Sequence, residues 1–118
     1  IIDCHSFPKY PLPYELNQEM DRPEICIGTD NFHTSEKLKN LFGELFEGLN
    51  FKIKYNEPFK GSIVPLKFYN KEIRVQSIMI EVRRDLYMDE KSGEKNYEFN
   101  KIKNILEKII NKFQHLIN

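Results

Sequence analysis

The sequence predicts an α/β fold with a mostly parallel or mixed central sheet flanked by helices. Short apolar stretches of strand length alternate along the chain with two longer stretches whose apolar residues recur at helical spacing. Strands that alternate with helices of this length are typical of layered α/β proteins, in which helices cover a largely parallel sheet. The 118 residues are enough for one domain with a moderate core.

The first predicted strand contains a carboxylate and an imidazole two residues apart. Side chains alternate between the faces of a strand, so Asp3 and His5 share one face. Pro8 has no N–H to donate and favours an extended or turning Phe7, so the strand should stop near His5. His5 is then expected at the carboxyl end of a strand, where open α/β sheets place their ligands.

Residues 9–24 are expected to form a loop, because three prolines fix φ and remove backbone donors there. A structureless connection this long in a compact domain is often functional. Its position after His5 would let this loop line a pocket. Equally, the loop could be a surface crossover that makes no contact with a ligand.

A short buried strand at Ile25–Ile27, closed by Gly28, precedes the first predicted helix. Thr34 or Ser35 can cap that helix, which is expected over residues 36–47. Its apolar stripe consists of Leu38, Leu41, Phe42, Leu45 and Phe46. His33 lies in the connection, and we favour a solvated loop histidine over a metal ligand because no ligand-spaced partner is nearby.

Residues 51–55 alternate apolar side chains with Lys52 and Lys54, which predicts a half-exposed strand near the sheet edge. A turn is expected at residues 56–61, where Gly61 can adopt positive φ. Residues 62–64 could form a short strand, followed by a polar link over 65–72.

The stretch 74–83 is apolar on both faces, so it is expected to form a strand inside the sheet. An ionised Glu81 within it is costly unless it is paired or near solvent, which predicts that Glu81 lies at the strand's exit beside a cleft. An ion pair of Glu81 with Arg83 or Arg74 is the structural alternative.

A long amphipathic helix is predicted from about Tyr97. Its apolar positions are Phe99, Ile102, Ile105, Leu106, Ile109, Ile110, Phe113 and Leu116. The lysines opposite them form a basic face that is expected to be solvated, although an acidic partner is an open alternative.

Composition restricts the function classes. Lys plus Arg equals Asp plus Glu at 18 each, so no net basic field favours nucleic acid, and small-molecule partners are expected. No stretch approaches the roughly 18 consecutive apolar residues of a membrane span. Cys4 and Cys26 are expected to be buried free thiols of a cytoplasmic protein rather than a disulfide. Composition gives no expectation of the oligomeric state.

Four ordered segments resemble the N-formylglutamate amidohydrolase family, whose wider relatives are the zinc carboxypeptidases and aspartoacylases. They are DCHSFP at 3–8, RPEICIGTD at 22–30, NEPFKG at 56–61 and IEVRRDLYMDE at 80–90. The resemblance implies a zinc carboxypeptidase-like fold. It also implies hydrolysis of the amide bond of a small N-acyl acidic amino acid, with N-formylglutamate as the leading candidate.

The resemblance also implies roles for individual residues. His5 corresponds to a zinc ligand, Asp3 would orient His5, and Glu81 corresponds to the general base. An acidic substrate also needs a positive group to hold its carboxylate, and Arg83 is the candidate because it shares a strand face with Glu81. Arg84 is expected in surface salt bridges. Asn56 and Gly61 belong to a turn that lies beside the active site in the family, so they are candidates for substrate binding.

The chain has no initiator Met and opens inside a predicted core strand. We therefore expect residues 1–118 to be the C-terminal part of a single amidohydrolase-like domain, truncated at its N-terminus, with the family's other zinc ligands upstream. Two alternatives stay open. One is a carboxypeptidase- or aspartoacylase-like hydrolase of another acyl amino acid or peptide, and the other is a metal-free structural or binding fragment.

Overall fold

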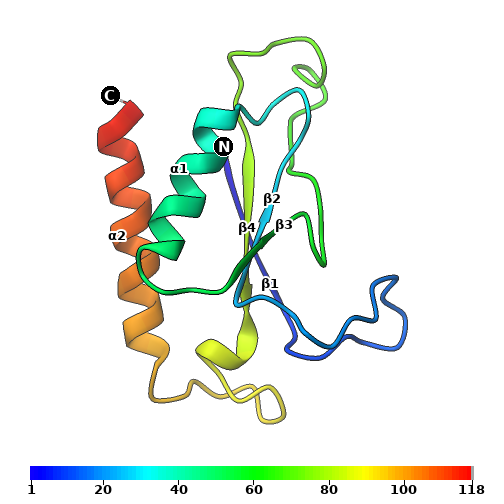
Figure 1. The fold of residues 1–118 in the computed structure, drawn as a ribbon, viewed down its shortest axis with the longest axis vertical. Coiled ribbons are helices and arrows are strands. Elements are labelled where there is room, and N and C mark those ends of the chain that lie inside the picture. Colours follow the sequence, from blue (N-terminus) through cyan, green and yellow to red (C-terminus); the bar gives the residue numbers. More distant parts are fainter. Residues whose placement is uncertain (118) are drawn as a thin grey trace. The chain divides into compact units, whose positions relative to one another are not determined.

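A computed structural model describes residues 1–117 and the side chains of residues 1–115 (Figure 1). The elements are β1 (Ile2–Phe7), β2 (Ile25–Gly28), α1 (Glu36–Glu47), β3 (Ile53–Tyr55), β4 (Ile78–Arg83), the 3-10 helix η1 (Arg84–Leu86) and α2 (Phe99–Ile117). The expected apolar position Leu116 lies outside the described side chains.

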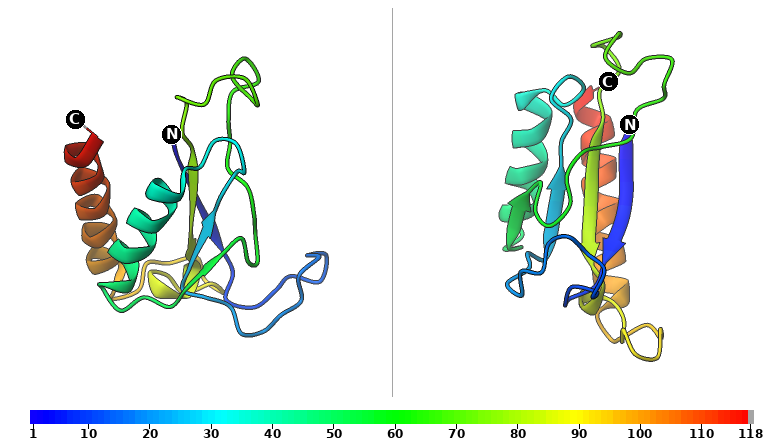
Figure 2. Two further views of the ribbon diagram at one scale, coloured as in Figure 1. Left: turned by 45° about the horizontal axis from the view of Figure 1, so that its top comes forward. Right: turned by 90° about the vertical axis from the view of Figure 1, so that its right-hand side faces the viewer.

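The four strands form one mixed sheet in the order β1-β4-β2-β3. The right-hand view of Figure 2 shows the strands next to one another in this order. β1 and β4 are parallel, β4 and β2 are antiparallel, and β2 and β3 are parallel. The prediction of an α/β fold with a mixed sheet is confirmed, with the apolar β4 inside the sheet and the lysine-bearing β3 at its edge.

The chain divides into two compact units, Ile1–Arg83 and Arg84–Asn118. The first contains the sheet and α1, which packs along β2 and β3. The second contains η1, a turn joined by the isolated bridge between Met88 and Lys95, and α2. In this unit Tyr87 and Phe99 pack edge to face, with ring centroids 6.1 Å apart.

The sequence of α1 explains its position on the sheet. Ser35 caps the helix by accepting a hydrogen bond from the Leu38 amide, as predicted. The buried side of the helix includes Leu38, Phe42 and Phe46. A Cβ built at Gly43 would meet the Tyr55 hydroxyl, so this side of α1 lies on the face of the sheet from which Tyr55 projects.

Several predicted boundaries differ from the structure. β1 continues past His5 to Phe7, because Pro8 ends the ladder only after that residue. β4 begins at Ile78 rather than Arg74, since residues before it are held in turns, with the Val75 amide bonded to Glu72 O. The suggested strand at 62–64 does not form, and the edge strand β3 is limited to Ile53–Tyr55.

Candidate functional site

The sheet register aligns four side chains in a row across one face. His5 is paired with Glu81 between β1 and β4, Glu81 with Cys26 between β4 and β2, and Cys26 with Lys54 between β2 and β3. Paired residues on neighbouring strands project from the same face of a sheet. The structure therefore brings the predicted ligand His5 and the predicted base Glu81 side by side, on the face opposite Tyr55.

Asp3 is hydrogen-bonded to His5. The His5 Nε2 and Asp3 Oδ1 atoms are 2.8 Å apart, and the other Asp3 oxygen accepts a hydrogen bond of 3.2 Å from the Ile63 amide. The imidazole side chain is 49% exposed, whereas that of Asp3 is 17% exposed. A fixed carboxylate on one ring nitrogen leaves the other nitrogen available to a ligand.

Glu81 is buried, with a relative exposure of 6%, and lies within β4 rather than at its exit. Its register partners on the neighbouring strands are His5 and Cys26, whose side chains project from the same face. The expected position at the exit of the strand is therefore wrong. Arg74 does not pair with Glu81, because the Arg74 guanidinium binds Glu72 in a bidentate pair.

Cys26 connects Glu81 to the next turn. Its thiol donates to the Phe59 carbonyl at 3.1 Å, and burial followed by the nearby Glu81 charge raises the pKa of Cys26 to about 11. The thiol therefore stays protonated at neutral pH. Both cysteines are free, as predicted, but Cys4 is exposed because it lies on the edge strand β1.

The turn at residues 56–61 covers this face of the sheet. Asn56 has a φ of 57°, and its Oδ1 accepts from the Thr29 amide at 2.8 Å and from Gly61 at 3.4 Å. Its Nδ2 donates to the Thr29 hydroxyl at 2.8 Å. The Gly61 carbonyl lies so close to Gly28 that a Cβ on Gly28 would clash with it. The polar atoms of Asn56 thus hold the turn against the end of β2.

Arg83 lies next along the same face after Glu81. Its Nη1 donates to the carbonyls of Arg22 at 2.8 Å and Pro23 at 3.4 Å, so part of its guanidinium fastens the end of the loop before β2. Arg84 begins η1 in the second unit.

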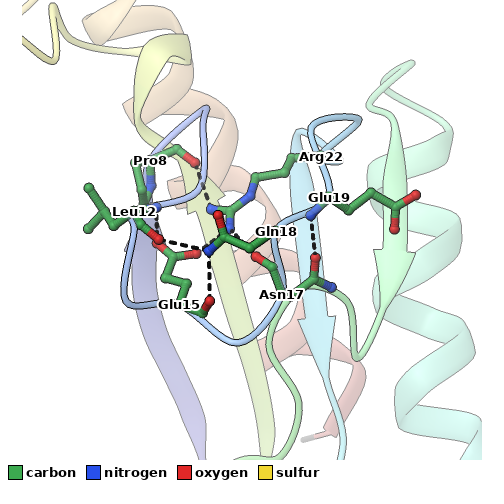
Figure 3. A network of polar contacts seen from close by, with 7 residues as sticks. All are labelled: Pro8, Leu12, Glu15, Asn17, Gln18, Glu19 and Arg22. Atoms are coloured by element: carbon green, nitrogen blue, oxygen red, sulfur yellow. Dashed lines mark hydrogen bonds and ion pairs between the residues drawn. The ribbon is translucent and has the colours of Figure 1, made fainter.

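Sequence reasoning missed the role of Arg22, which is 3% exposed. Its guanidinium pairs with Glu15 and donates to the carbonyls of Pro8 at 3.1 Å and Asn17 at 3.2 Å (Figure 3). The same group lies 5.9 Å from the Phe7 ring centre and 5.8 Å from that of Phe59. An arginine within a proline-containing loop, among apolar and acidic residues, was the available signal.

The loop over residues 9–24 does line a small pocket. Its other wall comes from β3 and the turn at 56–61, and the lining residues include Asn17, Asp21, Arg22, Lys54 and Glu57. Lys54 at the end of the row lines this pocket, whereas His5 and Glu81 do not.

His33 is a buried structural residue, and the prediction of a solvated loop histidine is wrong. It has no exposed surface, and the Asn70 amide donates to its Nε2 at 2.9 Å. The proton therefore sits on Nδ1, which donates to Val75 O at 2.8 Å. These partners are distant in sequence, which is why no local pattern revealed them.

Among the side chains of the row, His5 has surroundings that fit a metal ligand. His5 has a carboxylate on one ring nitrogen, which is the usual support of a metal-binding histidine. Within residues 1–117, no group of three or more His, Cys, Asp and Glu side chains is placed to hold a metal ion.

The mixed sheet and the His5–Glu81 row define the class as an α/β protein with acid–base side chains on one sheet face. Residues 1–88 match the family model of N-formylglutamate amidohydrolase. The chain belongs to the N-formylglutamate amidohydrolase family.

A solved structure supports the fold. The chain is similar to the crystal structure of N-formylglutamate amidohydrolase from Ralstonia eutropha JMP134, with a TM-score of 0.72 and 24% sequence identity. The match covers 92% of this chain and 40% of that chain. No curated protein matches the sequence. Across the described residues, the helices are too short or too polar to span a membrane.

Proposed function

We propose that the whole protein containing these residues is a zinc-dependent hydrolase of the amide bond of a small N-acyl acidic amino acid. N-formylglutamate, cleaved to formate and glutamate, is the first candidate substrate, because the family bears its name. The observation that supports the proposal is the pairing of His5 with Glu81 on one sheet face, with Asp3 bound to His5.

The residues of the proposed site would have distinct tasks. His5 would give one ligand to zinc through the ring nitrogen that does not face Asp3, and Asp3 would hold the imidazole in that orientation. Bound zinc would polarise the amide carbonyl and make an attacking water more acidic. The remaining ligands would come from residues outside the described row.

Glu81 would act as the general base. Its carboxylate would take a proton from the attacking water and pass it to the leaving nitrogen of the amide. Burial keeps bulk water from competing for that carboxylate. Arg83, which lies next to Glu81 on the same face of β4, would help to hold the substrate carboxylate. Asn56 and Gly61 would shape the adjoining turn.

The test is formate release from N-formyl-L-glutamate by the whole protein loaded with zinc, with Glu81→Gln measured alongside. Loss of a general base typically lowers the rate by about 10²- to 10⁴-fold, and we expect a loss of this size. Glu44→Gln is the matched control, because Glu44 is an exposed glutamate on α1 and should leave the rate unchanged.

The other outcomes separate the alternatives. Hydrolysis of other acyl amino acids or peptides, without formate release, would favour a carboxypeptidase- or aspartoacylase-like enzyme. A folded protein that binds no zinc and hydrolyses none of these substrates would favour a metal-free binding or structural role. The proposed location is the cytoplasm, where free thiols such as Cys4 and Cys26 stay reduced.

A further inference from the structure

A buried cluster centred on Arg22 lies where the candidate site meets the loop after β1. We call it the Arg22 clasp and define it as Arg22, Glu15, Phe7 and Phe59. Arg22 and Glu15 form an ion pair whose side chains are only 1% and 10% exposed. A charge pair removed from water to this degree needs further hydrogen bonds, and the carbonyls of Pro8 and Asn17 supply them.

The clasp closes the loop between Pro8 and Arg22. Nη1 of Arg22 binds the first residue of this loop, and Nη2 binds its middle at Glu15 and Asn17 (Figure 3). One rigid guanidinium therefore fixes three points of a segment that has no strand or helix of its own. A lysine ammonium on a flexible stem cannot reproduce this planar set of donors.

The Arg22 guanidinium also lies near two aromatic residues that adjoin the His5–Glu81 row. It is 5.9 Å from the Phe7 ring, and Phe7 follows His5 on the same face of β1. It is 5.8 Å from the Phe59 ring, and the Phe59 carbonyl accepts from Cys26, the register partner of Glu81. The two rings also pack edge to face at 5.9 Å.

We propose that Arg22 is a positioning residue that pre-forms the wall beside the His5–Glu81 row, by fixing both the loop over residues 9–21 and the Phe59 turn before substrate binds. This inference rests on the proposed function. A wall that is already ordered in the free protein spares the substrate the entropy cost of ordering it. The effect should therefore appear in KM rather than in kcat.

The decisive variant is Arg22→Lys, which keeps the charge but loses the planar donors. We expect KM for the hydrolysed acyl amino acid to rise about 10-fold or more while kcat changes less than about 3-fold. Zinc affinity should stay unchanged, because Arg22 does not contact His5 or Asp3. Arg74→Lys is the matched control, since Arg74 makes the same kind of pair with Glu72 on the exposed surface.

A second measurement needs no substrate. The loop carries exposed chymotrypsin target residues, namely Tyr10, Tyr14, Leu16 and Met20. We expect chymotrypsin to cleave this loop about 10-fold faster in Arg22→Lys than in the wild type, at a temperature where circular dichroism shows both to be folded. If Arg22→Lys does not fold, Glu15→Gln removes the charge pair while leaving Arg22 and its carbonyl contacts in place, and a smaller change of the same sign is expected.

Two results would overturn the inference. One is a KM and a cleavage rate both within about 2-fold of the wild type. The other is faster cleavage with an unchanged KM, which would mean that the clasp fixes the loop but does not shape the site. A wild-type protein without hydrolase activity would instead overturn the proposed function. Faster cleavage of Arg22→Lys in that case would still support the fixing of the loop, so the two failures are distinguishable.

Discussion

His5 and Glu81 lie side by side as register partners on the parallel strands β1 and β4, and Asp3 is bound to the imidazole of His5. The pairing fixes the spacing of the imidazole and the carboxylate through backbone hydrogen bonds rather than through flexible loops. A site built on strands holds its side chains with less freedom than one built on loops. The following predictions test the role of this pair and of the contacts that surround it.

Replacing His5 or Asp3 should weaken zinc binding by the whole protein. We expect Asp3→Asn to lower the affinity by about 10- to 100-fold, because the support of a ligating histidine is worth that much, and His5→Ala to lower it further. Chelator competition measures this directly. Cys4→Ser is the control, since Cys4 lies between them on the opposite face. A shift below about threefold in His5→Ala would count against the ligand role.

Alkaline pH should destabilise the fold through Cys26. Its folded pKa of about 11 lies above the usual value near 9, because of burial first and the Glu81 charge next. The neutral thiol is favoured in the folded state. Its contribution to the free energy of unfolding is therefore complete below pH 9 and is lost as the pH rises to 11.

Urea unfolding at pH 8 and pH 10.5 measures this contribution. Between these pH values, the free energy of unfolding of the wild type should fall by about 2 kcal/mol more than that of Cys26→Ala, which has no thiol at this position. Equal losses in the two proteins would contradict the assignment.

His33→Ala should lower the free energy of unfolding by about 2–4 kcal/mol. The change leaves a cavity and removes the partners of the Asn70 amide and the Val75 carbonyl. Urea unfolding measures the effect. His115→Ala serves as the control because His115 is exposed on α2, and it should change stability by less than about 0.5 kcal/mol.

Asn56→Ala should destabilise the turn over the site by about 1–3 kcal/mol, because it removes the acceptor of two amides and the donor to the Thr29 hydroxyl. Asn56→Asp keeps the acceptor and tolerates the positive φ, so it should recover most of the loss. If unfolding midpoints of the two variants were equal, the amide contacts would not be what holds the turn.

Gly28→Ala should cost more stability than Gly43→Ala. A Cβ at Gly28 would meet the Gly61 carbonyl, which is backbone, whereas one at Gly43 would first meet the Tyr55 hydroxyl, the far end of a side chain that can move. Overpacking of this kind typically costs about 1–3 kcal/mol. Thermal unfolding of the two variants gives the order, and a larger loss in Gly43→Ala would contradict it.

The main elements could be predicted from periodicity alone. The shared face of Asp3 and His5 follows from strand alternation, the helix of residues 36–47 from its apolar stripe and cap, and the edge position of β3 from its alternating lysines. These features depend on side chains close together in sequence, so local patterns contain them.

The remaining features depend on contacts between distant residues. Burial of His33 is decided by Asn70 and Val75, and that of Arg22 by Pro8, Glu15 and Phe59. Glu81 was expected near solvent because a lone carboxylate is costly inside a sheet, but the register places it between His5 and Cys26 in a buried part of β4. No single segment of the sequence contains that register.

The pairing of the first strand with the last strand of the Ile1–Arg83 unit has a consequence for biosynthesis. At about 5–20 residues per second, the ribosome makes β4 roughly 4–15 s after β1. During this interval β1 lacks this partner strand, and the closure of so long a loop makes the pairing slow. The imidazole and the carboxylate can therefore meet only after β4 has emerged, so this pair forms late in synthesis.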